Sequence, residues 1–288
     1  MKRSVIFLFL VLNYFRAESQ VITDSILVEN HYRTFHFNKP QQPTKNYNLV
    51  FVLHGSGGDG KGMMKPAANL EKESGKEHFF LVYPDGYKRY WNECRKAATS
   101  VANQQNINEQ AFFESMMRYF KKQYQVNDQQ FFAIGLSGGG HMTYKLALTM
   151  PDKCKGVSAI VANLPDASNM DCAELKKPVA VMITNGTKDS VNPYEGGQMM
   201  VNGSSYGTVR STDDTFNYWA GIAGYKGKPV VEVLPDTNTS NKQTITKFTF
   251  KDRGKPEVTL LKVLGGEHAF PGDVDAFIES WKFFKRQK

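Results

Sequence analysis

Short apolar runs alternate with segments of helical periodicity along most of the chain. The short runs predict strands at residues 48–55, 78–86, 131–136, 155–165, 177–189, 244–250 and 257–266. Apolar positions three or four residues apart predict helices at residues 109–124, 138–150, 212–224 and 273–284. Strands that alternate with helices favour an α/β fold, in which helices cover both faces of a mostly parallel sheet. In such sheets ligands bind beyond the carboxyl ends of the strands.

Two of the predicted helices have a clear apolar side. The first of them places Phe112, Met116, Tyr119 and Phe120 on one side, and the last places Val274, Phe277, Ile278, Trp281 and Phe284 there. The chain has 288 residues and shows no internal repeat, long linker or low-complexity stretch. A single catalytic domain at residues 20–288 therefore suffices.

The N-terminus differs in composition from the rest. Lys2 and Arg3 precede an apolar stretch of about a dozen residues, which is followed by the small residues Ala17 and Ser19. This order is typical of a signal peptide at residues 1–19, and the stretch is short for a membrane span of roughly 20 apolar residues. We therefore expect a secreted or periplasmic protein, without stable membrane insertion after the signal is removed. An uncleaved N-terminal anchor is the alternative.

The formal net charge is +8 at pH 7. Residues 1–19 carry three basic residues and one acidic residue, which leaves about +6 on the remainder. The basic residues are scattered and no nucleic-acid-binding motif is present, so we expect a solvated basic surface and no nucleic-acid partner.

Three cysteines are present, and an odd number cannot pair fully within one chain. In an exported protein, Cys154 and Cys172 could form a disulfide, which would leave Cys94 unpaired. No C-x-x-C motif or histidine cluster occurs, so we expect no metal and no cofactor.

The most informative junction follows the strand at residues 131–136. Its sequence is Gly135-Leu136-Ser137-Gly138-Gly139, a G-x-S-x-G pattern between a strand and a helix. In this pattern the serine occupies a strained turn and acts as a nucleophile. The alternative is a glycine-rich turn whose serine only caps the helix.

A serine nucleophile needs a histidine base and a carboxylate that orients the base. After an elbow of this kind, the chain order should be serine, acid, histidine. Asp189 follows the strand within residues 177–189, and His268 follows the strand within residues 257–266. Other candidates are placed less well, because His78 precedes a strand and His141 should project from the helix as a packing or surface residue.

Catalysis also requires hydrogen-bond donors for the oxyanion of the tetrahedral intermediate. The residues that follow the strand at 48–53 are His54-Gly55-Ser56-Gly57-Gly58, which resemble an HGGG-type loop. We expect the amides of Ser56 and Gly138 to be the donors, with Gly57 as the alternative to Ser56. His54 should order the loop by hydrogen bonding. A phosphate-binding loop is disfavoured because the Lys-Ser/Thr ending is missing.

Several motifs together resemble one family of exported α/β-hydrolases. They are VFVLHGSGGDG, YPDG before YWNEC, GLSGGGHMTYKLA, NGTKDSVNPYEGG, LPDTNTSNKQTITKFTF and GGEHAFPG. The family comprises feruloyl esterases, acetyl xylan esterases and polyhydroxybutyrate depolymerase-like proteins of the carbohydrate esterase family 1 type. The resemblance covers residue 48 to the C-terminus, and it implies the α/β-hydrolase fold and the Ser137, Asp189 and His268 triad.

Three positions depart from the family pattern. Gly138 replaces the usual Asn or Ala, Asn185 replaces a frequent His, and Phe270 replaces a frequent Trp. The polar stretch between Trp91 and Glu109 is short, and it could line the acyl pocket. These departures concern the substrate pocket more than the catalytic machinery.

The resemblance implies a serine esterase that releases feruloyl or acetyl groups from plant polysaccharides through an acyl-enzyme. Its substrate is a small ester or a polysaccharide-linked ester. Trp91 and Phe270 are candidates for aromatic walls around the substrate, with core packing as the alternative. A polyhydroxyalkanoate depolymerase or a general carboxylesterase is the second interpretation. A non-catalytic carbohydrate-binding relative is the most distant one.

Overall fold

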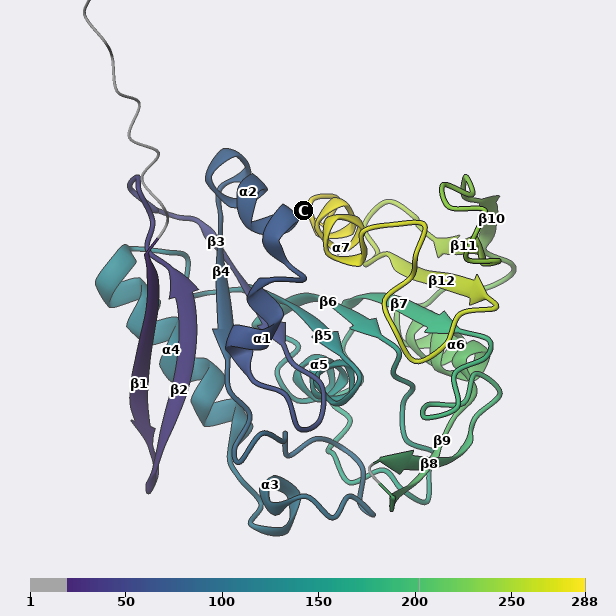
Figure 1. Ribbon diagram of the computed structural model, residues 1–288, viewed down its shortest axis with the longest axis horizontal. Coiled ribbons are helices and arrows are strands. Elements are labelled where there is room, and N and C mark those ends of the chain that lie inside the picture. The colour runs from purple at the N-terminus through teal and green to yellow at the C-terminus, as the bar shows by residue number, and fades with distance from the viewer. Residues whose placement is uncertain (1–19, 202, 288) are drawn as a thin grey trace, which may run out of the picture.

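The computed structural model describes residues 20–201 and 203–287. The predicted signal peptide at residues 1–19 lies outside this part of the chain. A single large sheet crosses the molecule and has helices on both faces (Figure 1). This arrangement confirms the predicted fold class.

The large sheet has ten strands in the order β1-β2-β4-β3-β5-β6-β7-β12-β11-β10. The six strands from β4 to β12 pair in parallel, and antiparallel strands extend both edges. The strands of this sheet are β1 (Val21–Val28), β2 (His31–Asn38), β3 (Asn48–Leu53), β4 (Phe79–Pro84), β5 (Phe131–Leu136), β6 (Cys154–Ile160), β7 (Ala180–Gly186), β10 (Val230–Val233), β11 (Thr244–Phe250) and β12 (Val258–Leu264). A separate hairpin is formed by β8 (Gly197–Val201) and β9 (Ser204–Val209).

Two groups of helices cover the sheet, each with its own hydrophobic core. One face packs against α4 (Glu109–Tyr124), α5 (Gly138–Thr149) and α6 (Thr212–Ile222). The other packs against α1 (Gly60–Met64), α2 (Ala68–Glu77) and α7 (Ala276–Phe284). A short helix, α3 (Val101–Gln104), lies in the loop that precedes α4.

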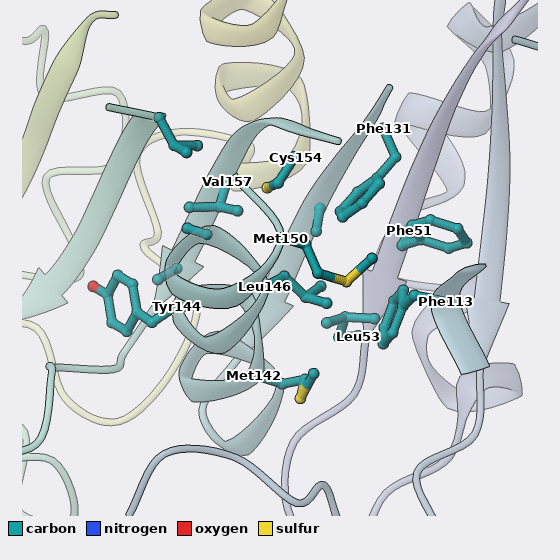
Figure 2. Close-up of a cluster of buried hydrophobic side chains, with 14 of the residues drawn as sticks. Phe51, Leu53, Phe113, Phe131, Met142, Tyr144, Leu146, Met150, Cys154 and Val157 are labelled. Atoms are coloured by element: carbon teal, nitrogen blue, oxygen red, sulfur yellow. The ribbon is translucent and has the colours of Figure 1, made fainter. Parts of the chain in front are cut away.

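Helix α5 shows how the sequence periodicity becomes packing. Met142, Leu146 and Met150 lie along one side of the helix and meet aromatic side chains of β3, β5 and α4 (Figure 2). Each of these three side chains is at most 6% exposed. Full burial of an apolar side chain of this size contributes about 1.5–3 kcal/mol. These three side chains therefore hold α5, the helix that follows Ser137, against the sheet.

The N-terminal hairpin is tied to the same face by a buried ion pair. Arg33 of β2 donates to the carboxylate of Glu109 at 2.8 Å, and both side chains are almost fully buried. The backbone amide of Asn92 donates to the other oxygen of Glu109 at 3.1 Å. Glu109, which closes the stretch expected to line the acyl pocket, is therefore a structural anchor.

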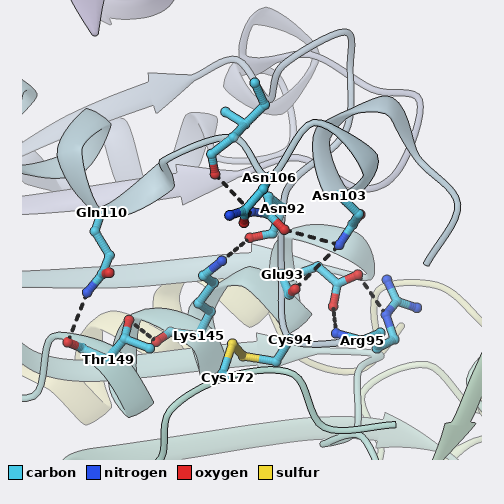
Figure 3. The surroundings of a disulfide bond; sticks show 11 residues. Asn92, Glu93, Cys94, Arg95, Asn103, Asn106, Gln110, Lys145, Thr149 and Cys172 are labelled. Carbon is cyan, nitrogen blue, oxygen red and sulfur yellow. Dashed lines mark hydrogen bonds and ion pairs between the residues drawn. A yellow bond between two sulfur atoms is a disulfide. The ribbon is translucent and has the colours of Figure 1, made fainter. Parts of the chain in front are cut away.

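The disulfide differs from the expected pairing. Cys94 is bonded to Cys172, whereas Cys154 is a free, buried thiol (Figure 3). Cys154 begins β6 inside the hydrophobic core, where burial raises the pKa of its thiol. Cys94 and Cys172 lie in two loops that the fold brings together, with Cα atoms 5.0 Å apart, within the range that a disulfide needs.

Candidate active site

The carboxyl ends of the central parallel strands converge on one edge of the sheet. The register pairs Leu53 of β3 with Gly135 of β5, and Ile160 of β6 with Thr184 of β7. The loops that follow β3, β5, β7 and β12 therefore emerge side by side. These four loops carry Ser56, Ser137, Asp189 and His268, respectively.

Ser137 has a backbone conformation that L-residues rarely adopt. Its φ is 52° and its ψ is −115°, between the end of β5 and the first turn of α5. Strain of this kind costs roughly 1–3 kcal/mol and persists where the surrounding structure enforces it. Here the Ser137 amide donates to the carbonyl of Ile160 at 2.8 Å, and its carbonyl accepts from the amide of His141 at 2.9 Å.

Two glycines allow the strand and the helix to meet at this turn. A Cβ atom on Gly135 would lie 2.1 Å from the carbonyl oxygen of Gly139. A Cβ atom on Gly139 would lie 2.4 Å from the carbonyl oxygen of Leu53. Both contacts are with backbone, so no side-chain movement could relieve them. The glycines of the G-x-S-x-G pattern are thus required by close packing.

His268 lies between the serine and the aspartate. Its Nε2 is 2.8 Å from Ser137 Oγ, and its Nδ1 is 2.7 Å from a carboxylate oxygen of Asp189. With the proton on Nδ1, the imidazole donates to Asp189 and can accept the Ser137 proton at Nε2. The His268 side chain is 22% exposed, so the group remains accessible from solvent.

The Asp189 carboxylate is fully buried and fully hydrogen-bonded. One oxygen accepts from the amides of Val191 and Asn192, both at 2.8 Å, and the other faces His268. The side chain is 0% exposed. Two backbone donors and one imidazole compensate for burial of the charge and fix the orientation of the carboxylate.

Ser56 and Gly138 lie against each other beside Ser137. A Cβ atom on Gly138 would lie 3.0 Å from the backbone nitrogen of Ser56. Neither amide donates a hydrogen bond to any residue within 20–201 or 203–287. Two adjacent amides that lack an internal acceptor form an arrangement able to bind an oxyanion.

His54 braces the loop that contains Ser56. The carbonyl of Gly55 lies 2.7 Å from Nδ1 of His54, and the amide of Gly86 donates to Nε2 at 2.8 Å. The backbone carbonyl of His54 accepts from the indole of Trp91 at 2.9 Å. Burial lowers the pKa of His54, which favours the neutral ring that this pattern requires. The expectation that His54 orders the loop is confirmed.

Comparison with known proteins agrees with this geometry. Residues 36–217 match the sequence profile of the phospholipase/carboxylesterase family, which covers well over half of the chain. The chain belongs to the phospholipase/carboxylesterase family. It is a carboxylic ester hydrolase of the serine type, and the resemblance to feruloyl and acetyl xylan esterases is confirmed.

Individual relatives of this carboxylesterase are distant. It is 28% identical to feruloyl esterase C of Emericella nidulans over 165 residues, which is 56% of this chain and 55% of the relative. It is 24% identical to feruloyl esterase D of Neurospora crassa over 283 residues, 93% of this chain and 86% of the relative. Acetyl xylan esterase from Aspergillus awamori shares the fold, with a TM-score of 0.61, 17% identity, and coverage of 91% of this chain and 99% of that one.

The two aromatic candidates of the carboxylesterase take different positions. Trp91 is 3% exposed, packs against the ring of His54 at 4.9 Å and belongs to the hydrophobic core. The interpretation of Trp91 as a substrate wall is therefore wrong, because its ring is buried against His54 beneath the loop that contains Ser56. Phe270 is half-buried, packs against Phe277 at 5.3 Å, and lines a cavity of about 10 Å³ beside the His268 loop.

Sequence reasoning missed a buried charged cluster next to the disulfide. Arg95 and Glu93 form an ion pair at 2.9 Å with side chains only 1% and 2% exposed (Figure 3). Arg95 also contacts the sulfur of Met199 on the β8–β9 hairpin and lies over the ring of Tyr206. Burial raises the pKa of Glu93, and Arg95 opposes that shift. No sequence signal distinguishes these charges from solvated ones.

His141 lies one helical turn after Ser137 and is 1% exposed. Neither ring nitrogen has a hydrogen-bond partner within the described residues. Burial lowers the pKa of His141 well below its usual range, and the charges of Arg95 and His268 act in the same direction. The ring is therefore a neutral packing group beneath the site.

Asn185 takes the position where the family often has histidine. It accepts from the amide of Ala162 at 3.0 Å and donates to Thr212 at 2.9 Å, which joins the loop after β6 to the start of α6. Its role is thus to hold neighbouring loops together.

A cavity of about 610 Å³ lies at the other end of β4, between α2 and residues 38–44. This end of the sheet is opposite to the one that carries Ser137, Asp189 and His268. Across residues 20–201 and 203–287, no group of three or more His, Cys, Asp or Glu side chains is placed to hold a metal ion. In the same part of the chain, no helix is both long enough and apolar enough to span a membrane.

Proposed function

We propose that this carboxylesterase is a secreted serine esterase that hydrolyses feruloyl or acetyl esters on plant polysaccharides. Ser137 is the nucleophile, His268 the general base and Asp189 the residue that orients and stabilises His268. The observation that carries the proposal is the position of His268, with one ring nitrogen 2.8 Å from Ser137 Oγ and the other 2.7 Å from Asp189.

Acylation begins when His268 Nε2 takes the proton of Ser137 as Oγ attacks the ester carbonyl carbon. The carbonyl oxygen becomes an oxyanion, which the amides of Ser56 and Gly138 stabilise. Asp189 stabilises the imidazolium through Nδ1. The intermediate then collapses, its bond to the alcohol oxygen breaks, and His268 returns the proton to the departing alcohol. Ser137 is left esterified to the acid.

Deacylation repeats these steps with water as the nucleophile. His268 takes a proton from water as the water oxygen attacks the acyl carbon. The second oxyanion is held by the same amides, and the bond to Ser137 Oγ breaks. His268 then protonates Oγ, which releases the carboxylic acid and regenerates the enzyme.

Two further observations support the substrate class and the location. Relatives across most of the chain are named feruloyl esterases, and a protein of the same fold is named an acetyl xylan esterase. The Cys94–Cys172 disulfide is of a kind that persists in oxidising compartments, which agrees with export. We propose that residues 1–19 are the signal peptide and that residues 20–288 are the catalytic domain. The mature protein is then secreted or periplasmic.

The test is hydrolysis by wild-type protein and by Ser137→Ala on methyl ferulate, acetylated xylan, short aliphatic esters and polyhydroxybutyrate. Wild type should hydrolyse the first or second substrate best, and Ser137→Ala should lose about 10⁴-fold or more in kcat without loss of thermal stability. Ser25→Ala, an exposed serine on β1, is the matched control and should retain full activity. Retained turnover by Ser137→Ala would refute the mechanism. A preference for polyhydroxybutyrate or for aliphatic esters would refute the substrate class alone.

A further inference from the structure

The hydroxyl of Ser56 occupies the space that a side chain at position 138 would fill. A Cβ atom on Gly138 would lie 2.5 Å from Ser56 Oγ, 3.0 Å from the Ser56 nitrogen and 3.5 Å from the Ser56 Cα. Real Cβ atoms do not approach an oxygen this closely. The observed position of the Ser56 hydroxyl is therefore compatible only with glycine at position 138. Gly138 directly follows Ser137, so the hydroxyl lies beside the proposed nucleophile.

This hydroxyl has no partner among the described residues. Ser56 is half-buried, and neither its amide nor its Oγ forms a hydrogen bond within residues 20–201 and 203–287. Hydroxyls on the adjacent helix are satisfied internally, as when Thr143 donates to the carbonyl of Gly140 at 2.7 Å. A helix- or turn-stabilising role, the usual structural reason for a serine at such a position, is thus missing for Ser56.

The backbone on both sides of Ser56 is held firmly. Nδ1 of His54 is 2.7 Å from the carbonyl of Gly55. The amide of Gly57 donates to the carbonyl of Arg89 at 2.9 Å, and Arg89 Nε donates to the carbonyl of Gly57 at 2.6 Å. A hydroxyl carried by so restrained a backbone has a defined position, which is what a preorganised donor requires.

We infer that the Ser56 hydroxyl is a third oxyanion donor, in addition to the amides of Ser56 and Gly138. The inference rests on the proposed function. A Cβ atom on Gly138 would be bonded to the same Cα as the Gly138 amide nitrogen, and it would lie close to both Ser56 Oγ and the Ser56 nitrogen. The hydroxyl and the two amides are therefore all close to the Cα of Gly138. The O–H group donates a hydrogen bond to the oxyanion and keeps its proton. The Ser56 hydroxyl does not compete as a nucleophile, because the base, His268 Nε2, is hydrogen-bonded to Ser137 Oγ.

Ser56→Ala tests the inference because it removes the hydroxyl and keeps the amide. For Ser56→Ala we expect kcat to fall about 10- to 100-fold with KM nearly unchanged, since the lost hydrogen bond forms only to the charged intermediate. The kcat of Ser56→Gly should fall by the same factor, whereas Ser56→Thr, which keeps a hydroxyl, should retain most of the wild-type kcat. A boronic acid, which forms a tetrahedral adduct with the nucleophile, should bind Ser56→Ala more weakly by a similar factor.

The partner position supplies a second, independent measurement. Gly138→Ala should displace the hydroxyl and lower kcat in wild type, but it should cost much less in the Ser56→Ala background. Equal costs in both backgrounds, or a kcat for Ser56→Ala within twofold of wild type, would overturn the inference and leave the proposed function intact. Absence of ester hydrolysis by wild type would overturn both.

Discussion

At the scale of single residues, backbone conformation distinguishes Ser137, the proposed nucleophile. Ser137 has a φ of 52°, and its hydroxyl is the one that faces His268. The sequence predicts this role because the G-x-S-x-G pattern carries its own physical reason, the close approach of Gly135 and Gly139 to neighbouring backbone. Asp189 and His268 were predicted to lie near Ser137 because each follows a strand of the parallel sheet, and His268 lies within hydrogen-bonding distance of both Ser137 and Asp189.

Other residue roles could not be predicted, because burial depends on distant parts of the chain. Trp91 follows a polar turn and has the size of a substrate-binding aromatic, yet its ring lies in the core beside His54. The hydroxyl of Ser56 acquires its position only once the loop after β3 meets Gly138. Neither fact is visible in local sequence.

His54→Phe tests the bracing of the oxyanion loop. The substitution removes both hydrogen bonds of the ring and leaves the buried amide of Gly86 without its acceptor. We expect a loss of about 1–3 kcal/mol in the free energy of unfolding, measured by urea denaturation. Because small displacements of catalytic donors are costly, kcat should also fall about 10- to 100-fold. An unchanged unfolding midpoint together with an unchanged kcat would contradict the assigned role.

At the scale of elements, periodicity predicted the six parallel strands and helices α4 to α7, and it missed α1, α2 and several peripheral strands. Helix α4 and strand β5 have the predicted bounds, because each buries several apolar side chains in the core. The β8–β9 hairpin and strand β10 were not predicted. They are short, and β10 is exposed along its whole length, so no buried face imposes a pattern on its sequence.

The disulfide is also an element-scale feature, because it joins two loops 78 residues apart in sequence. Removal of a disulfide that closes a loop of this length should cost about 2–5 kcal/mol. Cys94→Ser and Cys172→Ser should therefore melt well below wild type, and their double variant should resemble either single one. Cys154→Ser, which leaves the bond intact, is the comparison.

A thiol titration checks the pairing directly. The denatured, unreduced chain should present a single reactive thiol, that of Cys154. A free Cys94 thiol in wild type, together with no reactive thiol in Cys94→Ser, would instead indicate the Cys154–Cys172 pairing expected from the sequence.

At the scale of the whole molecule, the fold is set by one mostly parallel sheet with a hydrophobic core on each face, and the site is a product of that topology. Four loops meet because strands β3, β5, β7 and β12 end at the same edge. The sequence predicted this convergence from the alternation of strands and helices. It did not predict which histidines the sheet and its helices would bury.

Two buried histidines make global stability depend on pH. Burial lowers the pKa of His54 and, more strongly, that of His141, from an ordinary value of 6.5. The unfolded chain then binds more protons than the native protein, so stability is retained above about pH 6.5 and declines as the pH falls below it. Glu71 and Glu93 act in the opposite direction, because burial raises the pKa of each carboxyl.

His141→Leu separates the histidine contribution from these carboxyls. The free energy of unfolding of His141→Leu should rise relative to that of wild type as the pH falls from about 7.5 to about 5, because leucine has no proton to bind. Urea denaturation at several pH values measures the difference. A difference that stays constant over this range would show that His141 does not carry the linkage.

The central claim is that Ser137 is the nucleophile, and covalent labelling tests it most directly. A fluorophosphonate reagent reacts with an activated serine, and peptide mass spectrometry identifies the residue that carries the adduct. We expect one adduct per chain, on the peptide that contains Ser137, and none in Ser137→Ala or after denaturation. An adduct on Ser56 or on any other serine, accompanied by loss of esterase activity, would contradict it.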